Sequence, residues 1–199
     1  GAKVLQIRAV EFASKYKVKL RVLSSFNDGK GTQIIDEDDK MEQALISGVA
    51  LNKNEAQVTV VGVPDRPGIA SEILGPVAER DIEVDMIVQN SGADGATDFT
   101  FTVPRNEYEE TIRILHPLIK KMGANRVEGD EKIVKISIIG VGMRSHAGIA
   151  SKMFSALAKE NINIKMISTS EIKISVVLDE KYTELGVRCL HSAFGLDAD

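Results

Sequence analysis

The sequence contains a single cysteine, Cys189, among its 199 residues. One cysteine can form no disulfide bond within the chain and cannot build a zinc site from thiolates, so disulfide-stabilised and zinc-finger-like domains are excluded. Such sparing use of cysteine fits a reducing compartment, and we expect a cytoplasmic protein. The three histidines, His116, His146 and His191, lack the spacing of metal ligands, so we expect no metal site.

Long apolar runs and an excess of charge of one sign are also missing. No apolar run approaches the roughly 20 residues that a membrane-spanning helix needs, and the N-terminus lacks a signal-peptide pattern. The chain has 25 basic and 29 acidic residues and a net charge of −4, which gives no general attraction to nucleic acid or to an anionic membrane. Hydrophobic residues still make up 43% of the chain, enough for a core. Small molecules or proteins are therefore the expected partners.

Against these absences stands an internal repeat. The segments VPDRPGIASEIL, from residue 63, and MRSHAGIASKMF, from residue 143, place Gly68 and Gly148 80 residues apart. Extended without gaps, the alignment pairs Gly62 with Gly142 and IEVDMI (82–87) with INIKMI (162–167). In each copy a β-branched apolar run precedes the turn and an apolar stripe of helical spacing follows it. We predict a strand and then a helix, which starts at Pro67-Gly68 or at Ala147-Gly148.

Further elements follow in the same order in both copies. Apolar and polar residues alternate over 84–90, which predicts a second strand, and again over 99–103 and 172–176, which predicts a third. Apolar residues at helical spacing from Tyr108 to Ile119, and from Tyr182 to Leu190, then predict a second helix in each copy. ANRVEGD (124–130) is a plausible fourth strand for copy one. The order is then βαββαβ, an antiparallel sheet with two helices on one face.

The second copy ends without a closing strand, whereas ALISGVAL (44–51) precedes the first copy and has no partner there. We predict that 44–51 crosses over to complete the second sheet. The predicted fold class is therefore α+β, with two ferredoxin-like domains of βαββαβ order, the first inserted into the second. The predicted boundaries are 57–130 for the first domain, and 41–56 together with 131–199 for the second.

Residues 1–40 differ from both repeats. The sequence predicts one helix around Leu5 to Ala13, one strand within KVKLRVLSSF (17–26), and a charged, turn-rich linker over 27–40. A lone helix and strand cannot bury a core of their own. Because the chain also begins with Gly1, we expect these residues to be the last elements of another domain.

The chain as a whole resembles the C-terminal regulatory region of bacterial aspartate kinases (aspartokinases), and its repeats resemble a pair of ACT domains. The resemblance rests on GAKVLQIRAVEFASKYKVKLRVLSSF (1–26), SGVALNKNEAQVTVVGVPDRPGIA (47–70) and INIKMISTSEIKISVVL (162–178). Residues 1–40 then resemble the end of the catalytic domain and its linker. Met41, in DKMEQALISGVA, resembles the internal start from which some aspartokinases make a separate small subunit.

The resemblance implies a function. The whole enzyme would transfer a phosphoryl group from ATP, with Mg²⁺, to L-aspartate on the route to lysine, threonine and methionine. This chain would be its feedback sensor for L-lysine, L-threonine or both, with no catalysis and no cofactor of its own. Its expected partners are these amino acids, the catalytic subunit or domain, and a second copy that pairs through the ACT domains.

An amino-acid sensor must bind both an ammonium and a carboxylate group. A helix N-terminus offers unpaired N–H groups and a partial positive charge to the carboxylate, and glycine allows close approach to the backbone. Asp65, three residues before Gly68, can accept the ammonium group. A lysine side chain needs a further acid, for which Asp85 and Glu171 are candidates. In copy two Ser145 takes the place of Asp65, so we expect the first copy to make the main effector contacts.

By resemblance, effector pockets lie between ACT domains packed side by side, usually across subunits. The residues that this places at the site come from the first turn, the following strand and the facing domain. They are Asp65, Gly68, Ile69, Ala70, Glu83, Val84, Asp85, Gln89, Asn90, Asn161, Asn163, Ile164, Ser170 and Glu171.

Each of these residues also has a purely structural interpretation. Asp65 can be a turn or capping residue, and the acids at 83 and 85 can form a solvated strand face. Ser170 and Glu171 can form a turn between strands, and Asn161 and Asn163 can cap a helix.

Two other functions fit the same elements. The repeats can form a dimerisation module that holds kinase subunits together without binding an effector. The βαββαβ order is also that of RNA-recognition domains, which display aromatic residues on an open, basic sheet face. Phe99 and Phe101 are in phase, but Ile172 and Ile174 replace them in copy two and the net charge is negative, which argues against RNA.

Overall fold

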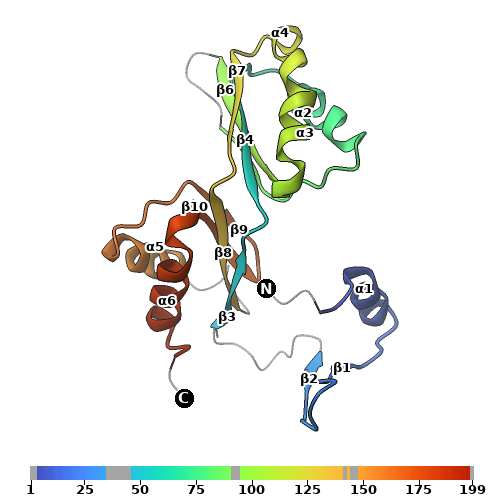
Figure 1. The fold of residues 1–199 in the computed structure, drawn as a ribbon, viewed down its shortest axis with the longest axis vertical. Coiled ribbons are helices and arrows are strands. Elements are labelled where there is room, and N and C mark those ends of the chain that lie inside the picture. Colours follow the sequence, from blue (N-terminus) through green and yellow to red (C-terminus); the bar gives the residue numbers. More distant parts are fainter. Residues whose placement is uncertain (1–3, 35–45, 91–94, 141–142, 144–147, 198–199) are drawn as a thin grey trace.

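The computed structural model describes residues 4–34, 46–90, 95–140, 143 and 148–197. Within them it contains two four-stranded sheets and one two-stranded sheet. Figure 1 shows the two larger sheets one above the other, each with its helices on one face. The domain formed by β4 to β7 is called the first domain, and the domain formed by β3 and β8 to β10 is called the second domain.

The first domain is an antiparallel sheet in the strand order β5-β6-β4-β7. Its elements are β4 (Ala56–Pro64), α2 (Ile69–Ala78), β5 (Ile87–Gln89), β6 (Ala96–Val103), η1 (Arg105–Glu107), α3 (Tyr108–Leu115), η2 (His116–Leu118), α4 (Ile119–Met122) and β7 (Arg126–Asp130). The single helix predicted from Tyr108 to Ile119 is wrong in one respect, because it is interrupted by the 3-10 turn η2. Pro117 lies at the start of that turn and lacks the N–H group that a continuous α-helix requires.

The second domain has the same architecture, in the order β3-β8-β10-β9. Its elements are β3 (Ile46–Asn52), β8 (Ile133–Gly140), α5 (Ile149–Lys159), β9 (Met166–Thr169), β10 (Lys173–Asp179), η3 (Glu180–Tyr182) and α6 (Thr183–Phe194). Strand β3 precedes the first domain in sequence but pairs with β8, with Ala50 opposite Ser137. The predicted crossover, and with it the insertion of the first domain into the second, is confirmed. Residues 44 and 45 lie outside the described residues.

Each domain has its own core between the sheet and the helices. In the first, alternate residues of β4 and β6 such as Val58, Val60 and Phe101 pack against Ile73 and Val77 of α2. The second core is built in the same way. Its fully buried large side chains include Ile136, Ile138, Met153, Leu157, Leu178 and Leu190. Burying one such side chain stabilises the fold by about 1.5–3 kcal/mol, so each domain has a hydrophobic core of its own.

The strand register corrects the ungapped alignment at one point. Ile87 and Ile167 are equivalent, since they face Phe101 and Val176 on the neighbouring strands. Phe101 in turn faces Val58, whereas Val176 faces Ile136. The first strands of the copies are therefore 78 residues apart, although Gly68 and Gly148 are 80 apart. The second turn is longer by the two residues, so Gly62 and Gly142 are not equivalent.

Two predicted strands are shorter in the structure. The strand predicted over 84–90 is reduced to β5, because the Met86 N–H donates to the Thr102 hydroxyl at 3.1 Å, where a regular ladder has a carbonyl. The Asp85 N–H still donates to the Thr102 carbonyl at 3.2 Å. The strand predicted from residue 172 begins at Lys173, and Ile172 is exposed.

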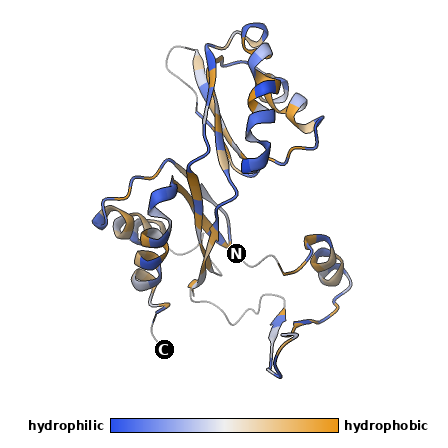
Figure 2. Cartoon of the chain, in the orientation of Figure 1, coloured by the Kyte–Doolittle hydropathy of each residue, from blue (hydrophilic) through white to orange (hydrophobic). Residues whose placement is uncertain are grey.

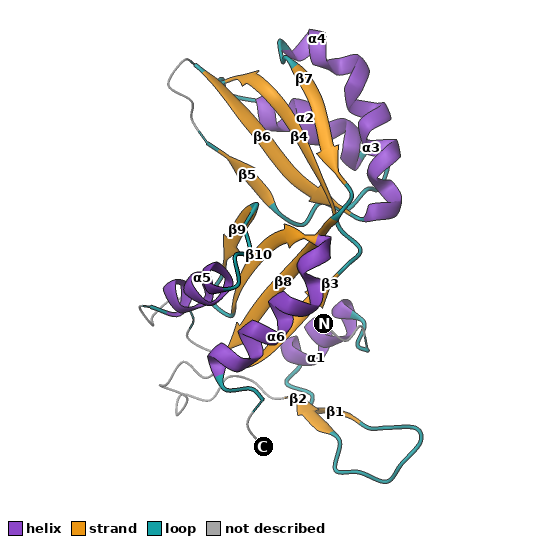
Figure 3. Ribbon diagram, turned by 60° about the vertical axis from the view of Figure 1, so that its left-hand side comes forward, coloured by secondary structure: helices purple, strands orange, loops and turns teal. Residues whose placement is uncertain are grey.

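The sheet faces that carry no helices meet at one end of each sheet, around a small buried cluster, and Figure 3 shows the two sheets adjoining there. Met86 from the first domain meets Ile133, Met166 and Val177 of the second in a buried cluster, with Val88 beside it. Met86 and Met166 occupy equivalent positions in the repeat. The interface is therefore approximately two-fold symmetric, so that equivalent surfaces of the repeat face each other.

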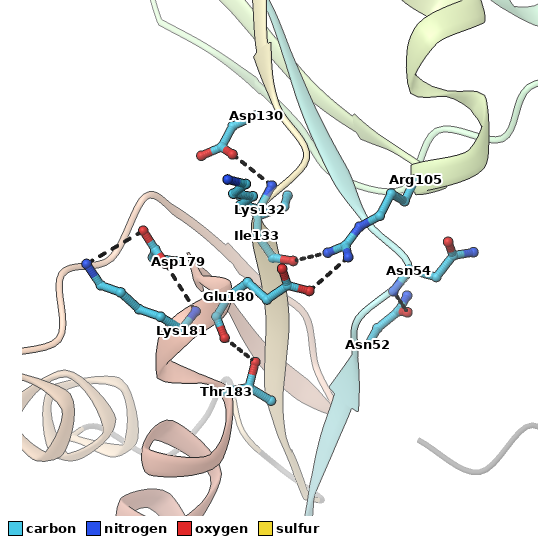
Figure 4. A network of polar contacts seen from close by, with 10 residues as sticks. All are labelled: Asn52, Asn54, Arg105, Asp130, Lys132, Ile133, Asp179, Glu180, Lys181 and Thr183. Carbon is cyan, nitrogen blue, oxygen red and sulfur yellow. Dashed lines mark hydrogen bonds and ion pairs between the residues drawn. The ribbon is translucent and has the colours of Figure 1, made fainter.

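Polar contacts link the two domains beside this apolar cluster, and Figure 4 shows those of Arg105. The Arg105 guanidinium donates to Glu180 Oε1 at 2.8 Å and to the Ile133 carbonyl at 3.0 Å. Arg105 and Glu180 are the first residues of η1 and η3, which follow the third strand of each domain. Lys165 forms an ion pair with Asp130. Opposite charges at equivalent positions let the near-symmetric surfaces attract each other rather than repel.

The N-terminal segment lies beside the second domain in Figure 1 and contains α1 (Ile7–Lys15), β1 (Leu20–Val22) and β2 (Thr32–Ile34). The helix and the first strand are as predicted, but part of the predicted linker forms β2, which pairs with β1. Three residues behind a glycine turn are too few to show an alternating pattern. Figure 2 shows apolar residues on these elements. Among the described residues, eight of the eleven exposed large hydrophobic side chains lie here: Val4, Leu5, Ile7, Phe12, Tyr16, Val18, Leu23 and Phe26.

The contact between Asp130 and Lys165 predicts a pH dependence. Burial by itself raises the pKa of Asp130, but hydrogen bonds from the Lys165 ammonium and the Lys132 backbone N–H more than offset this, so the pKa lies below its ordinary 3.8. A depressed pKa in the folded state stabilises the protein above the unfolded pKa, and this contribution is lost as the pH falls through the folded pKa. We expect Asp130→Asn to reduce the acid sensitivity of the unfolding free energy below about pH 4, by less than about 1 kcal/mol because the pair is partly exposed. Urea unfolding of both proteins between pH 3 and 6 measures this, and parallel curves would contradict it.

Candidate functional site

The turn between β4 and α2 combines an exposed acid with an open helix N-terminus. The Asp65 N–H donates to the Gly95 carbonyl at 2.9 Å and the Arg66 N–H to the Pro64 carbonyl at 3.0 Å, which fixes the turn. Gly68 caps the helix with φ at 92°, as predicted for the helix start. A Cβ at Gly68 would meet no atom within 4 Å. The glycine is therefore needed for its backbone angle, since the described residues leave space for a Cβ at this position.

Arg66 lies in this turn but is held by the helix. Its guanidinium donates two hydrogen bonds to Glu72, at 2.7 and 2.8 Å. The hydrogen bond from Arg66 lowers the pKa of Glu72, and the same bond raises the pKa of Arg66. Among the described residues the Asp65 carboxylate has no hydrogen-bond or ion-pair partner, and its side chain is exposed. The turn thus presents one acid whose charge is not already paired within the described part of the chain.

The second copy repeats the backbone of this turn. Gly148 caps α5 with φ at 97°, and a Cβ there would again meet nothing within 4 Å. Ser145 and Ala147, which enter the sequence comparison of the two turns, lie outside the described residues. The described part of the second turn therefore shows the same open helix start, and the chemistry before it stays a prediction.

Gln89 and Asn90 lie at the end of β5, and both side chains are exposed. Strand β5 is an edge strand, as is its equivalent β9 in the second domain. The equivalent residues Ile87 and Ile167, on these two strands, are 52% and 44% exposed. An edge strand with unpaired backbone groups and an exposed apolar side chain is suited to pairing with another sheet.

A cavity of about 550 Å³ at the junction of the domains brings together three predicted site residues, Glu83, Val84 and Asp85. The sequence interpretation missed the rest of its lining. These residues are Asn52, Asn54, Glu55, Val103 and Pro104. The polar run NKNE (52–55) immediately before β4 was the available signal. Asp85 is not a free acid in this cavity, because its carboxylate contacts the Lys135 ammonium.

A second cavity of about 460 Å³, also at the junction, brings together Asn90 of the first domain and Ile164 of the second. Its remaining lining combines polar groups from the first sheet with the start of β9. It consists of Gln57, Val88, Asp98, Thr100, Lys165, Met166 and Ile167. The Gln57 Oε1 atom is buried and has no hydrogen-bond partner among the described residues. This cavity lies between the two domains of one chain, whereas the pockets predicted from the resemblance lie mainly between subunits and stay a prediction.

Other predicted residues belong to neither cavity. Ser170 N–H donates to the Lys173 carbonyl at 2.8 Å and its hydroxyl accepts from the Lys173 N–H at 3.2 Å, so it forms the turn between β9 and β10. The Glu171 carbonyl accepts from Met143 N–H at 3.1 Å. Asn161 has φ at 56° where α5 ends, as its equivalent Asp81 has after α2. These contacts favour structural roles for Ser170 and Asn161.

Three more predicted residues, Ile69, Ala70 and Asn163, also lie outside the two large cavities at the junction of the domains. The Ile69 side chain is 2% exposed and belongs to the core, and Ala70 is half-buried beside it. The Ile69 N–H already donates to the Arg66 carbonyl at 3.4 Å, so of these two residues only the Ala70 N–H at the helix start is suited to a ligand. Asn163 is exposed just before Ile164. The turn residues and the second-domain residues therefore lie on separate parts of one chain's surface.

Within the described ranges, no three His, Cys, Asp or Glu side chains are grouped so that they could hold a metal ion. None of the helices in this part of the chain is long and apolar enough to cross a membrane.

Comparison with known proteins gives the family. The ACT domain model matches residues 57–120, and a second ACT domain model matches residues 136–194. The regulatory subunit of aspartate kinase from Thermus thermophilus, solved in a ligand-free form, is 39% identical with a TM-score of 0.71, and the match covers 75% of this chain and 98% of that one. This chain belongs to the aspartate kinase family, as its tandem ACT-domain regulatory part. The two domains are ACT domains of ferredoxin-like fold.

Two further relatives define the extent of the match. Aspartate kinase from Pseudomonas fluorescens is 66% identical over all 199 residues, which span 48% of that protein. The chain therefore covers about half the length of its curated relatives. Aspartokinase III from E. coli, solved in complex with lysine and aspartate, shares the fold with a TM-score of 0.74 at 24% identity, and the match covers 98% of this chain and 43% of that one.

The turn geometry gives a stability prediction. Gly68→Ala should destabilise the protein by about 1–2 kcal/mol, because a non-glycine residue is strained at this positive φ even though space is available. The matched control is Gly75→Ala inside α2, where a Cβ also meets nothing within 4 Å and alanine should stabilise the helix by about 0.5–1 kcal/mol. Urea unfolding measures both variants, and equal effects at the two positions would contradict the interpretation.

Proposed function

We propose that this chain is the feedback sensor of an aspartate kinase and that it binds L-lysine, L-threonine or both at interfaces between ACT domains. The observation that carries the proposal is the exposed Asp65 carboxylate beside the open N-terminus of α2. It offers an acid to an ammonium group and backbone N–H groups to a carboxylate, three residues apart.

The exposed edges suggest how the site is completed. Gln89 and Asn90 lie on one exposed edge strand and Asn163 precedes the other, and each edge carries an exposed isoleucine. A second copy that pairs along these edges would bury both isoleucines and bring the second-domain residues of one chain near the first turn of the other. We therefore infer a homodimer through the ACT domains.

Lysine is the preferred effector for two reasons. The E. coli relative of the same fold was solved with lysine, and Glu83, an exposed acid that lines the junction cavity, suits a cationic side chain. Threonine is proposed to act alongside it. An effector can change the enzyme only if it binds one arrangement of the domains more tightly than another. The change would pass through β3 and 53–55 toward the catalytic part, where ATP, Mg²⁺ and L-aspartate are proposed to bind, in the cytoplasm.

The two alternative functions, a dimerisation module and an RNA-binding domain, are supported to different degrees. A purely structural dimerisation module would use the same edges, but it gives no reason for an unpaired acid at Asp65. An RNA-binding surface is contradicted by the structure, because Phe99 and Phe101 are 1% and 0% exposed and pack under the helices. Part of the opposite face of that sheet, including Gln57 and Thr100, lines a cavity shared with the second domain.

Isothermal titration calorimetry tests the sensing function directly. We expect heat on titration with L-lysine or L-threonine, together with a rise in thermal midpoint, because a ligand that binds only the folded state stabilises it. L-Aspartate and glycine are controls of similar charge at the α-carbon. Absence of both heat and thermal shift with lysine and threonine, alone and together, would leave only the dimerisation function.

Asp65→Ala tests the proposed ammonium contact. Removing a charged hydrogen-bond partner costs about 1.5–3 kcal/mol of binding, which is roughly a tenfold to hundredfold weaker affinity. The fold should be unaffected within about 0.5 kcal/mol because the side chain is exposed. Glu79→Ala, an exposed acid at the other end of α2, should bind normally. Unchanged affinity in Asp65→Ala would assign Asp65 to the turn alone.

A further inference from the structure

Lys135, Glu55 and Asp85 form an ion cluster that joins the two domains. The Lys135 ammonium lies 2.7 Å from Glu55 Oε1 and also contacts the Asp85 carboxylate. The side chains of Lys135 and Glu55 are only 11% and 4% exposed, whereas that of Asp85 is 43% exposed. The cluster thus consists of a buried pair, Lys135 and Glu55, and an exposed arm, which is the contact of Lys135 with the partly exposed Asp85.

The buried pair lies beside both passages of the chain between the domains. The first passage runs from Asn52 to Ala56 and contains Glu55. The second runs from Asp130 to Ile133, and Lys135 follows it in β8, on the sheet face that carries no helices. An ammonium and a carboxylate buried together hold each other firmly, because separating them would leave both charges uncompensated.

Further hydrogen bonds fix both passages. Asn52 Nδ2 donates to Glu55 Oε1 at 2.7 Å, and the Asn54 N–H donates to Asn52 Oδ1 at 3.0 Å (Figure 4). On the second passage Arg105 holds the Ile133 carbonyl. Lys135 is therefore anchored at the junction, and any group that binds Lys135 is held at the same junction.

Asp85 belongs to the segment that leads into the exposed edge. It comes two residues before β5, whose end carries Gln89 and Asn90. The sequence suggested that Asp85 accepts the cationic side chain of an effector, but its carboxylate already has an internal ammonium partner. Its contact links the edge strand of the first domain to a lysine of the second.

We propose that Lys135 is a positioning residue of the effector response. It holds Asp85, and through Asp85 the segment 85–90, in a fixed position relative to both passages. A displacement of the edge strand then moves the second domain. Asp85 then supports effector binding by anchoring this segment to Lys135 rather than by contacting the effector. This inference rests on the proposed sensing function, but its structural half can be measured without any effector.

The experiment compares two variants of the 199-residue chain. Asp85→Asn removes the exposed arm and keeps the buried pair. The double variant Glu55→Gln with Lys135→Met removes the buried pair without leaving a lone buried charge, and it does not alter the β5 segment. In both we expect the backbone amide resonances of residues 87–90 to shift in ligand-free NMR spectra, and the affinity for lysine or threonine in calorimetry to fall about tenfold.

The control is Lys132→Met, which removes an exposed lysine from the second passage. It should leave the resonances of 87–90 and the affinity unchanged. If the double variant behaves like this control while Asp85→Asn loses affinity, Asp85 contacts the effector directly and the inference is overturned. It is equally overturned if neither variant shifts the resonances of 87–90.

Chemical rescue separates positioning by charge from simple packing. In Lys135→Ala, propylammonium replaces the missing atoms of the side chain, and we expect it to return the resonances of 87–90 toward their original positions. Lys135→Met, which fills the space without charge, should not respond. If the original chain binds neither lysine nor threonine, the sensing function fails, and the shifts and rescue still decide whether Lys135 positions the edge strand.

Discussion

The pairing of β3 with β8 is the constraint on which the rest of the structure depends. A strand that precedes the first domain in sequence completes the sheet of the second. The chain must therefore pass between the domains twice, each time through only a few residues. Two adjacent passages bring the helix-free faces of the sheets together around Met86, Ile133 and Met166. Without this pairing the domains would be joined by one linker, and the junction would lose one of its two passages.

The two copies of the repeat share their backbone structure but differ in the charged side chains at their interface. Equivalent backbone angles recur at Gly68 and Gly148 and at Asp81 and Asn161, so both copies begin and end their first helix in the same way. The side chains differ where the copies meet. Arg105 faces Glu180 from the equivalent position, and Asp85 of one copy corresponds to Lys165 of the other. Charges that oppose each other across a near two-fold axis let one repeat bind its own copy.

Regulation needs an element that two sites can both bias. The junction has the features of such an element, because it combines a small apolar cluster with a buried ion pair and a few surrounding polar contacts. Two complete cores lie on either side of it. A change at the edge of one domain can therefore be transmitted as a rigid-body displacement rather than dissipated in a deformable interior.

The sequence alone determined the order of the elements, the glycine turns and the crossover of β3, since these follow from local periodicity, from backbone angles that only glycine adopts easily, and from a count of strands. It also placed Asp65 in the turn before the first helix, where the structure has it, and its contact with an effector stays a prediction. It did not predict the loss of regular pairing before β5, where the Thr102 hydroxyl replaces a ladder carbonyl, or the extra two residues of the second turn. Only the tertiary structure decided that Asp85 meets Lys135 and that NKNE lines the junction. Those contacts join residues far apart in the chain, and no periodicity records which distant charge lies across an interface.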